Sequence, residues 1–260
     1  MRQGPVTPPP AGAGGGTLHS VTSALDVLDC FTTSEDLGVT DVARRLGVAK
    51  STAHRLLSTL SSRGMVERVA ATGHYRLGLH LWELGQLVQD REPLRHLALP
   101  LLEEVRLRTR QTAHLSIADG PDVVFVERLP SLSGIALLGE RHRRVPLHST
   151  SAGKALAAFN ADVSRARVAA GFPRLTDRTI ASAEAWEDCL ADVRRRGSAA
   201  SDSENLVGLA SVAAPVIDTS GVAVAAVSVA GPTSDVIDHL DRHSRVVMIA
   251  AARLSQRIGG

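Results

Sequence analysis

The stretch GVTDVARRLGVAKSTAHRLLSTLSSRGMVER (residues 38–68) decides the fold of the N-terminal half. Its apolar positions recur at helical spacing and predict two short helices. The first is expected to have Thr40 as its N-cap and to end at Gly47. The second is expected to begin at Lys50 or Ser51 and to close at the next glycine. Two short helices joined by a tight turn are the core of a helix-turn-helix motif.

A two-stranded hairpin should follow these helices. Residues 65–69 and 74–77 read as strands, and the glycine between them supplies the turn. Upstream, Val21, Leu25 and Leu28 recur at helical spacing and predict a first helix that joins the same small core. The combination predicts a winged helix-turn-helix, whose second motif helix has the size to enter the DNA major groove.

Basic residues concentrate over this part of the chain. Residues 40–76 hold seven Lys or Arg and two acids, a net charge of +5, whereas the whole chain carries only +2. Such a patch is typical of a surface that binds a polyanion, although a solvated charged face or a protein-binding winged helix would also fit. The predicted DNA contacts are Lys50, Ser51, Thr52, His54 and Arg55 on the second motif helix, Arg68, His74 and Arg76 on the wing, and Thr40 before them.

Length and composition fit two modest globular domains, since 260 residues with a hydrophobic content of 44% can fill two cores. The expected divisions are a disordered tail at 1–16, the winged helix-turn-helix at 17–78, a linker helix at 79–92 and a second domain at 93–260. Cys30 and Cys189 are far apart in sequence, which favours a reducing cytoplasm over a disulfide framework. No apolar run reaches the length of a membrane span, and no signal peptide is recognised.

The second domain mixes predicted strands and helices. Strand-like runs cover 112–118, 122–129, 135–138, 211–217 and 222–229, and amphipathic helices begin near Pro93 and Ser151 and cover 163–170, 181–196 and 234–257. Tight connections join consecutive strands at Gly120 and Gly221. The domain is therefore expected to be α+β with a largely antiparallel sheet.

Two short patterns invite a ligand interpretation that does not hold. Lys154 follows a glycine as in a phosphate-binding loop, but that pattern needs glycine at His148 and Ser or Thr at Ala155. His239 and His243 are four residues apart, as metal ligands can be, but the aspartates around them favour a charged solvent face. Neither a cofactor nor a metal ion is expected.

Both halves resemble one family of bacterial regulators. LHSVTSALDVLDCF (18–31), the stretch at 38–68 and YRLG (75–78) resemble the DNA-binding half of the IclR family. VPLHSTSAGKALAAF (145–159), GSAASDSENLVGLASVAAPVID (197–218) and VAVAAVSVAGP (222–232) resemble its second half. The family signature is matched at Gly197, Ser201, Glu204, Ser211, Val212, Ala213 and Asp218. Ser198 and Ile217 stand where aromatic residues are usual.

The resemblance implies a GAF-like effector-binding domain with a cavity on one face of its sheet. The matching cavity positions are Ser151, Ala152 and Gly153 at a helix start, Ser201, Ser211 and Ser228, with Leu137 and Leu138 as apolar walls. A helix start built of small residues exposes N–H groups to an anion, and three hydroxyls could complete its hydrogen bonding. A small carboxylate or related metabolite would suit such a site. Alternatively, Thr150 or Ser151 only caps the helix and the serines satisfy nearby main chain.

These observations predict a transcriptional regulator, repressor or activator, whose operator binding responds to a small molecule. One recognition helix reads few bases, so a homodimer on a near-palindromic DNA operator is expected, with the apolar helix at 79–88, including Trp82, in its interface. The resemblance further implies a dimer of dimers. The alternative is a small-molecule hydrolase with an appended winged helix. Because GxSxG is absent and no Ser/His/Asp arrangement has motif support, no catalytic residue is assigned.

Overall fold

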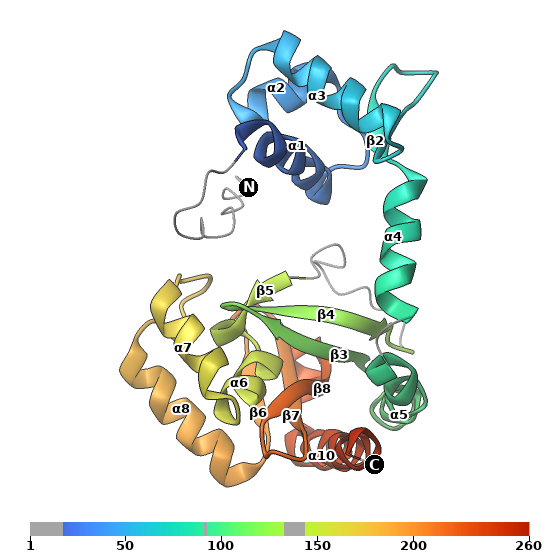
Figure 1. Ribbon diagram of the computed structural model, residues 1–260. Helices are drawn as coiled ribbons and strands as arrows, with labels where there is room; N and C mark the ends of the chain where they lie inside the picture. Colours follow the sequence, from blue (N-terminus) through green and yellow to red (C-terminus); the bar gives the residue numbers. More distant parts are fainter. Residues whose placement is uncertain (1–17, 91–92, 133–143, 260) are drawn as a thin grey trace. The chain divides into compact units, whose positions relative to one another are not determined.

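The computed structural model describes residues 18–90, 93–132 and 144–259 (Figure 1). The chain divides into two compact units, Met1–Leu87 and Val88–Gly260, each with its own apolar core. The predicted tail at 1–16, the predicted strand at 135–138 and the predicted cavity walls Leu137 and Leu138 lie outside the described residues.

The first unit is a winged helix-turn-helix, as predicted. Its elements are α1 (His19–Asp29), η1 (Cys30–Thr33), α2 (Val39–Leu46), α3 (Lys50–Ser62), β1 (Val66–Arg68) and β2 (Tyr75–Leu77). The helix α4 (Leu79–Asp90) begins in this unit and crosses its boundary at Leu87. The core takes one buried side chain or two from each early element, among them Val27, Phe31, Val42 and Leu57. Gly47 ends α2 with φ at +67°, a left-handed conformation that glycine adopts without a Cβ clash.

Two sequence expectations in this unit are wrong. Thr40 does not cap α2, because Gly38 is the N-cap and its N–H is accepted by the Asp41 carboxylate at 3.3 Å. Val21 and Leu25 do not join the core, since their side chains are 52% and 58% exposed. The helix is real, but much of its apolar stripe faces solvent within this chain.

The wing is anchored by close main-chain contacts. β1 and β2 pair antiparallel, and Tyr75 also bridges Leu37, so the hairpin is tied to the loop before α2. Gly78 follows β2 and donates its N–H to Met65 O at 2.8 Å. A Cβ at Gly78 would lie 2.1 Å from Gly64 O, so only glycine fits where the wing turns into α4.

The second unit is built on one antiparallel sheet in the order β5-β4-β3-β8-β7-β6, which confirms the predicted α+β class. The strands are β3 (Thr112–Asp119), β4 (Asp122–Leu129), β5 (Arg144–Pro146), β6 (Ala199–Asp202), β7 (Leu209–Ile217) and β8 (Ala223–Pro232). The helices are α5 (Pro93–Thr109), η2 (Leu147–Ser149), α6 (Ser151–Ala158), α7 (Ala161–Ala170), α8 (Ala183–Arg196), α9 (Thr233–Ile237) and α10 (Leu240–Ile258).

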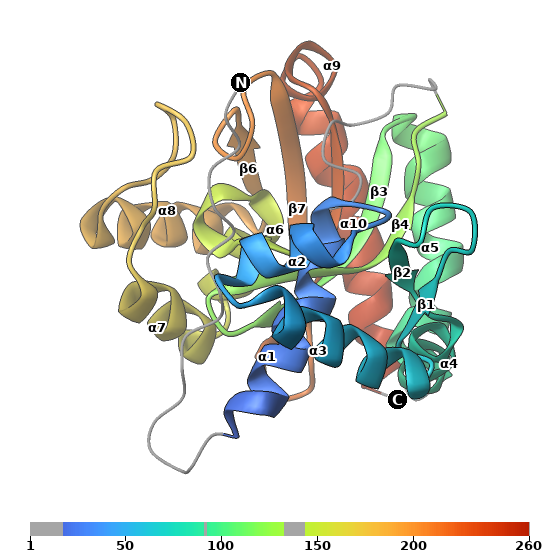
Figure 2. The ribbon, with the colours of Figure 1, turned by 90° about the horizontal axis from the view of Figure 1, so that it is seen from above.

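Helices cover both faces of this sheet. α5 and α10 lie side by side and pack on the face that presents Leu115, Val212 and Val227. α6, backed by α7 and α8, packs on the opposite face, against Ala213 and Ala226 (Figure 2). Most of β7 and β8 is therefore buried on both faces, and polar side chains over the centre of the α6 face are removed from water.

Three features of the second unit differ from the sequence expectation. The strands β5 and β6 were not predicted, because three or four residues carry little periodicity and β6 is made of Ala, Ser and Asp. The final helix is two helices, α9 and α10, divided around Asp238. His243 does not lie on a solvent face, since it is 2% exposed and packs into α10's buried side.

Candidate DNA interface and candidate effector site

The recognition helix α3 presents a polar face and buries an apolar one. Ala53 and Leu57 are fully buried in the core, which turns the opposite side of the helix outward. All five residues predicted on α3 are exposed: Lys50, Ser51, Thr52, His54 and Arg55. Helical geometry therefore gathers them on the first turns, as a helix that enters a groove with its N-terminal end requires.

The N-terminus of α3 also leaves main-chain donors free of side-chain caps. Its N-cap is Ala49, which has no side-chain acceptor, so neither Lys50 nor Ser51 caps the helix. The first intrahelical bond runs from Ala53 N to Ala49 O at 3.0 Å. The three preceding N–H groups have no intrahelical acceptor, and together with the helix dipole they suit a phosphate.

The cationic side chains around α3 differ in how many hydrogen bonds or ion pairs they already form within the protein. Arg45 is exposed, but it donates to Cys30 O at 2.6 Å and to the hydroxyls of Thr33 and Ser34, so it joins α2 to η1. On the wing, Arg68, His74 and Arg76 are exposed. Arg76 is paired across the wing with Glu67, and Arg68 Nε lies 3.4 Å from Gly73 O. Several of the seven cations counted in the sequence therefore already have a partner within the unit.

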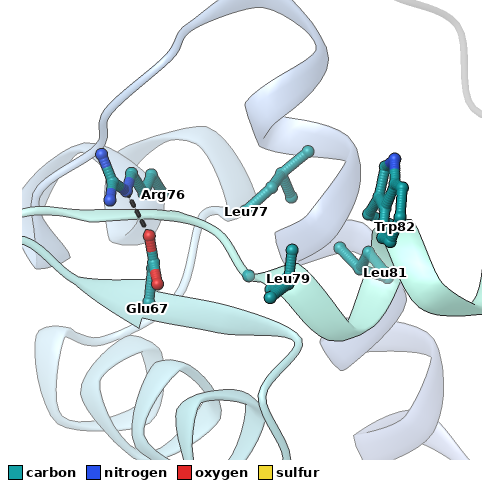
Figure 3. Close-up of a pocket in the computed structure, with 7 residues that line it drawn as sticks. Glu67, Arg76, Leu77, Leu79, Leu81 and Trp82 are labelled. Atoms are coloured by element: carbon teal, nitrogen blue, oxygen red, sulfur yellow. Dashed lines mark hydrogen bonds and ion pairs between the residues drawn. The ribbon is translucent and has the colours of Figure 1, made fainter.

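An apolar surface remains open on the same unit. Besides Val21 and Leu25, the exposed apolar side chains include Leu18, Leu77, Leu79, Trp82, Leu84 and Leu87. Figure 3 shows the hollow that α4 forms with the wing, about 560 Å³ in volume, bordered by Leu77, Leu79, Leu81 and Trp82 and by the Glu67–Arg76 pair. Exposed apolar surfaces of this kind are typical of domains that contact another molecule.

The start of α6 is fully buried in the second unit. Thr150 is the N-cap, and its Oγ1 accepts the Gly153 N–H at 3.1 Å. A Cβ at Gly153 would lie 2.1 Å from Leu147 O, so the glycine allows the helix to sit against η2. The Gly153 N–H is therefore already paired, and the donors of the first turn that remain for an anion are the N–H groups of Ser151 and Ala152.

The predicted serines share the α6 face of the sheet. Ser151 Oγ donates to Ser211 Oγ at 2.8 Å, which joins α6 directly to β7. Ser201 pairs with Ser211 in the β6–β7 register, and its hydroxyl donates to Ser149 O at 3.1 Å. Ser228 lies on β8 and is buried. Sequence reasoning thus brought four serines to one face, although Ser201 also has the local main-chain partner that the alternative interpretation requires.

A buried ion pair joins α6 to the segment that follows β6. Lys154 Nζ lies 2.5 Å from Glu204 Oε1 and donates to Ala200 O at 3.1 Å. The Lys154 and Glu204 side chains are only 4% and 12% exposed. Burial raises the pKa of Glu204, opposed by the Lys154 ammonium. The lysine that resembled a phosphate-binding residue therefore has a structural partner, which the family signature contained as Glu204.

Sequence reasoning missed a polar row on β3. His114 and Ser116 are 6% and 0% exposed and point to the α6 face. Their atoms His114 Nδ1 and Ser116 Oγ have no hydrogen-bond partner among the described residues. Burial, with a smaller contribution from the Arg128 charge, lowers the pKa of His114 to about 3, so its imidazole is neutral at physiological pH. The alternation of polar and apolar residues in TAHLSI (112–117) is the sequence feature that could have indicated a polar row on one face of this strand.

The described residues contain neither a metal-binding cluster nor a membrane-spanning helix. Within residues 18–90, 93–132 and 144–259, no group of three or more His, Cys, Asp or Glu side chains could hold a metal ion. None of the helices in the described part of the chain is long and apolar enough to cross a membrane.

Comparisons with known proteins cover both units. Residues 20–70 match the family described as IclR helix-turn-helix domain, and residues 86–256 match Bacterial transcriptional regulator IclR C-terminal. The HTH-type transcriptional regulator XynR of Escherichia coli (strain K12) is 34% identical over 246 residues, which cover 93% of this chain and 98% of that protein. This relative is described as a transcriptional regulator.

Solved structures agree with the sequence relatives. An IclR transcriptional regulator from Alicyclobacillus acidocaldarius aligns with a TM-score of 0.80 and 26% identity, covering 94% of this chain and 100% of its own. An IclR homologue from Microbacterium hydrocarbonoxydans, complexed with 4-hydroxybenzoate, aligns with a TM-score of 0.79 and 27% identity, covering 92% of this chain and 98% of its own. The similarity therefore spans the DNA-binding and the C-terminal unit together.

Proposed function

Because the chain belongs to the IclR family of bacterial transcriptional regulators, we propose that it binds a near-palindromic operator as a dimer, and that a small carboxylate in its C-terminal unit modulates this binding. The observation that carries the proposal is the uncapped, exposed start of α3 with Lys50, Ser51, Thr52, His54 and Arg55 around it. The helix N-terminus would hold a phosphate and so set the register, while Arg55 would reach a base edge.

Operator binding of two arginine variants tests the placement of α3 and the wing. Arg55→Ala should weaken binding to the operator by about 1–3 kcal/mol and relax its sequence preference, because a bidentate base contact is lost. Arg76→Ala should weaken binding to all sequences alike and reduce the salt dependence. Arg165→Ala, an exposed arginine paired with Asp162 on α7, is the matched control. Unchanged operator affinity in both test variants would reject this placement.

The occupant that we propose for the exposed apolar surface is a second copy of the chain. The α1 and α4 side chains that are exposed in this unit, such as Leu25, Leu79 and Trp82, would be buried when two copies pair. A symmetric pair would also give the operator its two half-sites. Pairing of such dimers through their C-terminal units would produce a tetramer, as the sequence resemblance implies.

Sedimentation of a charged variant tests the dimer. Trp82→Arg should convert the protein to a species of half the mass, because a charge would be placed within an apolar interface. Ala71→Arg adds the same charge at the exposed wing turn and should leave the mass unchanged. A wild-type protein that sediments as a monomer at micromolar concentration, and protects a single asymmetric half-site in footprinting, would overturn the proposal.

The proposed effector lies between the start of α6 and the sheet. The N–H groups of Ser151 and Ala152 and the Ser211 hydroxyl suit a carboxylate. The related Microbacterium protein was crystallised with an aromatic carboxylate, 4-hydroxybenzoate, which supports this chemistry. The serines also favour a regulator over a hydrolase, because the hydroxyls of Ser151 and Ser201 donate to Ser211 and to main chain, respectively, rather than to a histidine base.

Calorimetry with small carboxylates and an operator-release assay test the effector site. The probes are benzoate, 4-hydroxybenzoate, pentanoate and 5-hydroxypentanoate. Ser211→Ala should weaken binding of the tightest acid about ten- to a hundred-fold while effector-free operator binding persists. Ser211→Leu should fill the site and abolish the acid's effect on the operator. Wild-type binding and response in both variants would place the effector elsewhere.

A further inference from the structure

We propose that His114 and Ser116 form a second polar end of the effector site, which selects acids that carry a hydroxyl at the end opposite the carboxylate. This inference rests on the proposed function, since it takes the α6 start as the carboxylate end. It adds β3 residues that neither the family signature nor the serine set includes. The evidence is the register of the sheet and the buried unpaired atoms on β3.

The sheet register places His114 on the same face as the serines. His114 lies directly opposite Ser228 of β8, and Ser116 lies opposite Ala226. Directly opposed residues of an antiparallel pair point to the same side. Ser211 of β7 lies opposite Ala230, which in turn lies opposite Thr112, two residues before His114. The β3 pair therefore continues the serine row, two strands away from the α6 start.

The spacing of the two ends sets the length of the ligand. Two strand spacings of about 4.8 Å and two residues along β3 separate the Cα atoms of Ser211 and His114 by roughly 12 Å. A hydrogen bond of about 2.8 Å at each end leaves roughly 6 Å between the polar groups of a bound molecule. An acid with a hydroxyl across a six-membered ring, or at the end of a five-carbon chain, has about this length.

Two buried polar atoms at the β3 end have no hydrogen-bond partner among the described residues, which is energetically unfavourable. His114 Nδ1 and Ser116 Oγ have no hydrogen-bond partner in the described protein, and their residues are more than nine-tenths buried. A buried polar group without a partner costs about 1–3 kcal/mol, so an apolar side chain at either position would stabilise the fold more. Two such atoms side by side on the face that holds the proposed effector are explained by a polar group of the effector.

The chemistry of this end favours a hydroxyl over a second carboxylate. A neutral imidazole offers one donor and one acceptor nitrogen, and a serine hydroxyl can do both, which matches a group that donates and accepts. The pKa of His114, lowered by burial to about 3 with a smaller contribution from the Arg128 charge, keeps the ring neutral, so the imidazole itself does not pair with a second anion. Arg128, which lies opposite His114 on β4, already has an interaction within the protein. The Phe125 ring, 4.8 Å from the imidazole centroid, orients the histidine, and Ser228 and Ala230 of β8 lie between His114 and Ser211 in the register of the sheet.

Matched pairs of acids test the inference in the full-length protein. Calorimetry compares benzoate with 4-hydroxybenzoate and pentanoate with 5-hydroxypentanoate. In the wild type, the hydroxy acid of at least one pair should bind tenfold or more tightly than its partner. Ser116→Ala and His114→Leu should each remove most of that difference while the affinity for the unhydroxylated acid stays within about twofold.

A stability measurement separates this role from a structural one. Without acid, Ser116→Ala should keep or raise the unfolding midpoint, because it removes an unpaired buried hydroxyl. Ser255→Ala is the matched control and should lower the midpoint, because Ser255 Oγ accepts Ile217 N and donates to Ala251 O. It should leave acid binding unchanged.

The outcomes distinguish this inference from the proposed function. Equal affinities within both wild-type pairs, or an advantage of the hydroxy acid that survives in both β3 variants, overturn the β3 end and leave the carboxylate site standing. A lowered midpoint for Ser116→Ala in the absence of acid also overturns it, because the hydroxyl then has a structural role. If none of the four acids binds, the proposed carboxylate effector and this inference both fail.

Discussion

Replacing Lys154 by Met should reveal how strongly α6 depends on its ion pair. The side chains of Lys154 and Glu204 are 4% and 12% exposed, so removal of the ammonium leaves a carboxylate in a dry site with one oxygen, Oε2, already unpaired. Breaking a buried pair in this way costs about 3–5 kcal/mol. The lost bond to Ala200 O adds about 1 kcal/mol. Against a typical stability of about 5–15 kcal/mol, the variant should be marginal.

The double variant Lys154→Met/Glu204→Leu is the control for charge rather than packing. It removes both ions and should recover most of the loss, ending about 1 kcal/mol below the wild type because the Ala200 carbonyl stays without its donor. The single variant should also respond to pH. Its folded-state Glu204 has a pKa above the ordinary value of 4.5, so stability is highest below that pH and falls as the pH rises through the folded-state pKa.

Urea unfolding followed by tryptophan fluorescence measures both effects. The chain has two tryptophans, and Trp82→Phe leaves the fully buried Trp186 as the reporter of the second unit. Midpoints at pH 5, 6, 7 and 8 would give the free energy of unfolding of each variant. The reasoning is refuted if Lys154→Met lies within about 1 kcal/mol of the wild type at pH 8, or if the double variant is no more stable than the single one.

Three further predictions follow from buried groups and glycines. The pKa of His114 is lowered to about 3, so below pH 6.5 the unfolded chain takes up a proton that the folded chain does not. The free energy of unfolding therefore decreases as the pH falls below 6.5. His114 should contribute about 2 kcal/mol to the loss of unfolding free energy between pH 7.5 and 5, and His114→Leu should remove that part while the smaller contributions of His148 and His243 remain. Gly153→Ala should lower the unfolding free energy by about 3 kcal/mol because its Cβ meets main chain, whereas Gly85→Ala in α4, with open space around it, should raise it by about 0.5–1 kcal/mol. Burial raises the pKa of the Cys30 and Cys189 thiols, so both should react with iodoacetamide at pH 7.5 more slowly than free cysteine does, and only urea should restore the free rate.

Sequence reasoning worked best where one residue type has one physical use. Gly47 and Gly64 were placed at helix ends, and both adopt left-handed φ values of +67° and +70° that other residues adopt at a cost. The apolar stripe of α1 was predicted to lie in the core, and this prediction is wrong for Val21 and Leu25. An apolar pattern does not distinguish a residue that packs in its own domain from one that packs against another molecule. Sequence periodicity alone treats an intermolecular face and a domain core alike.

The candidate effector site shows the same division. The positions of Ser151 and Ser211 came from the family resemblance, and the structure joins them by a hydrogen bond across 60 residues of chain. His114 and Ser116 were not proposed, although they alternate with apolar residues along β3. In a sheet with one solvated face, such polar positions face water; here helices cover both faces, and burial from tertiary packing gives these side chains their chemistry.

The Glu67–Arg76 pair on the wing has a consequence for the search for an operator. When a phosphate approaches Arg76, the arginine must leave its carboxylate partner, and Glu67 then repels the same phosphate. The wing therefore adheres less to arbitrary DNA than a free arginine would. A chromosome offers millions of competing sites for every operator, so weaker adhesion to them leaves more of a scarce regulator at its target.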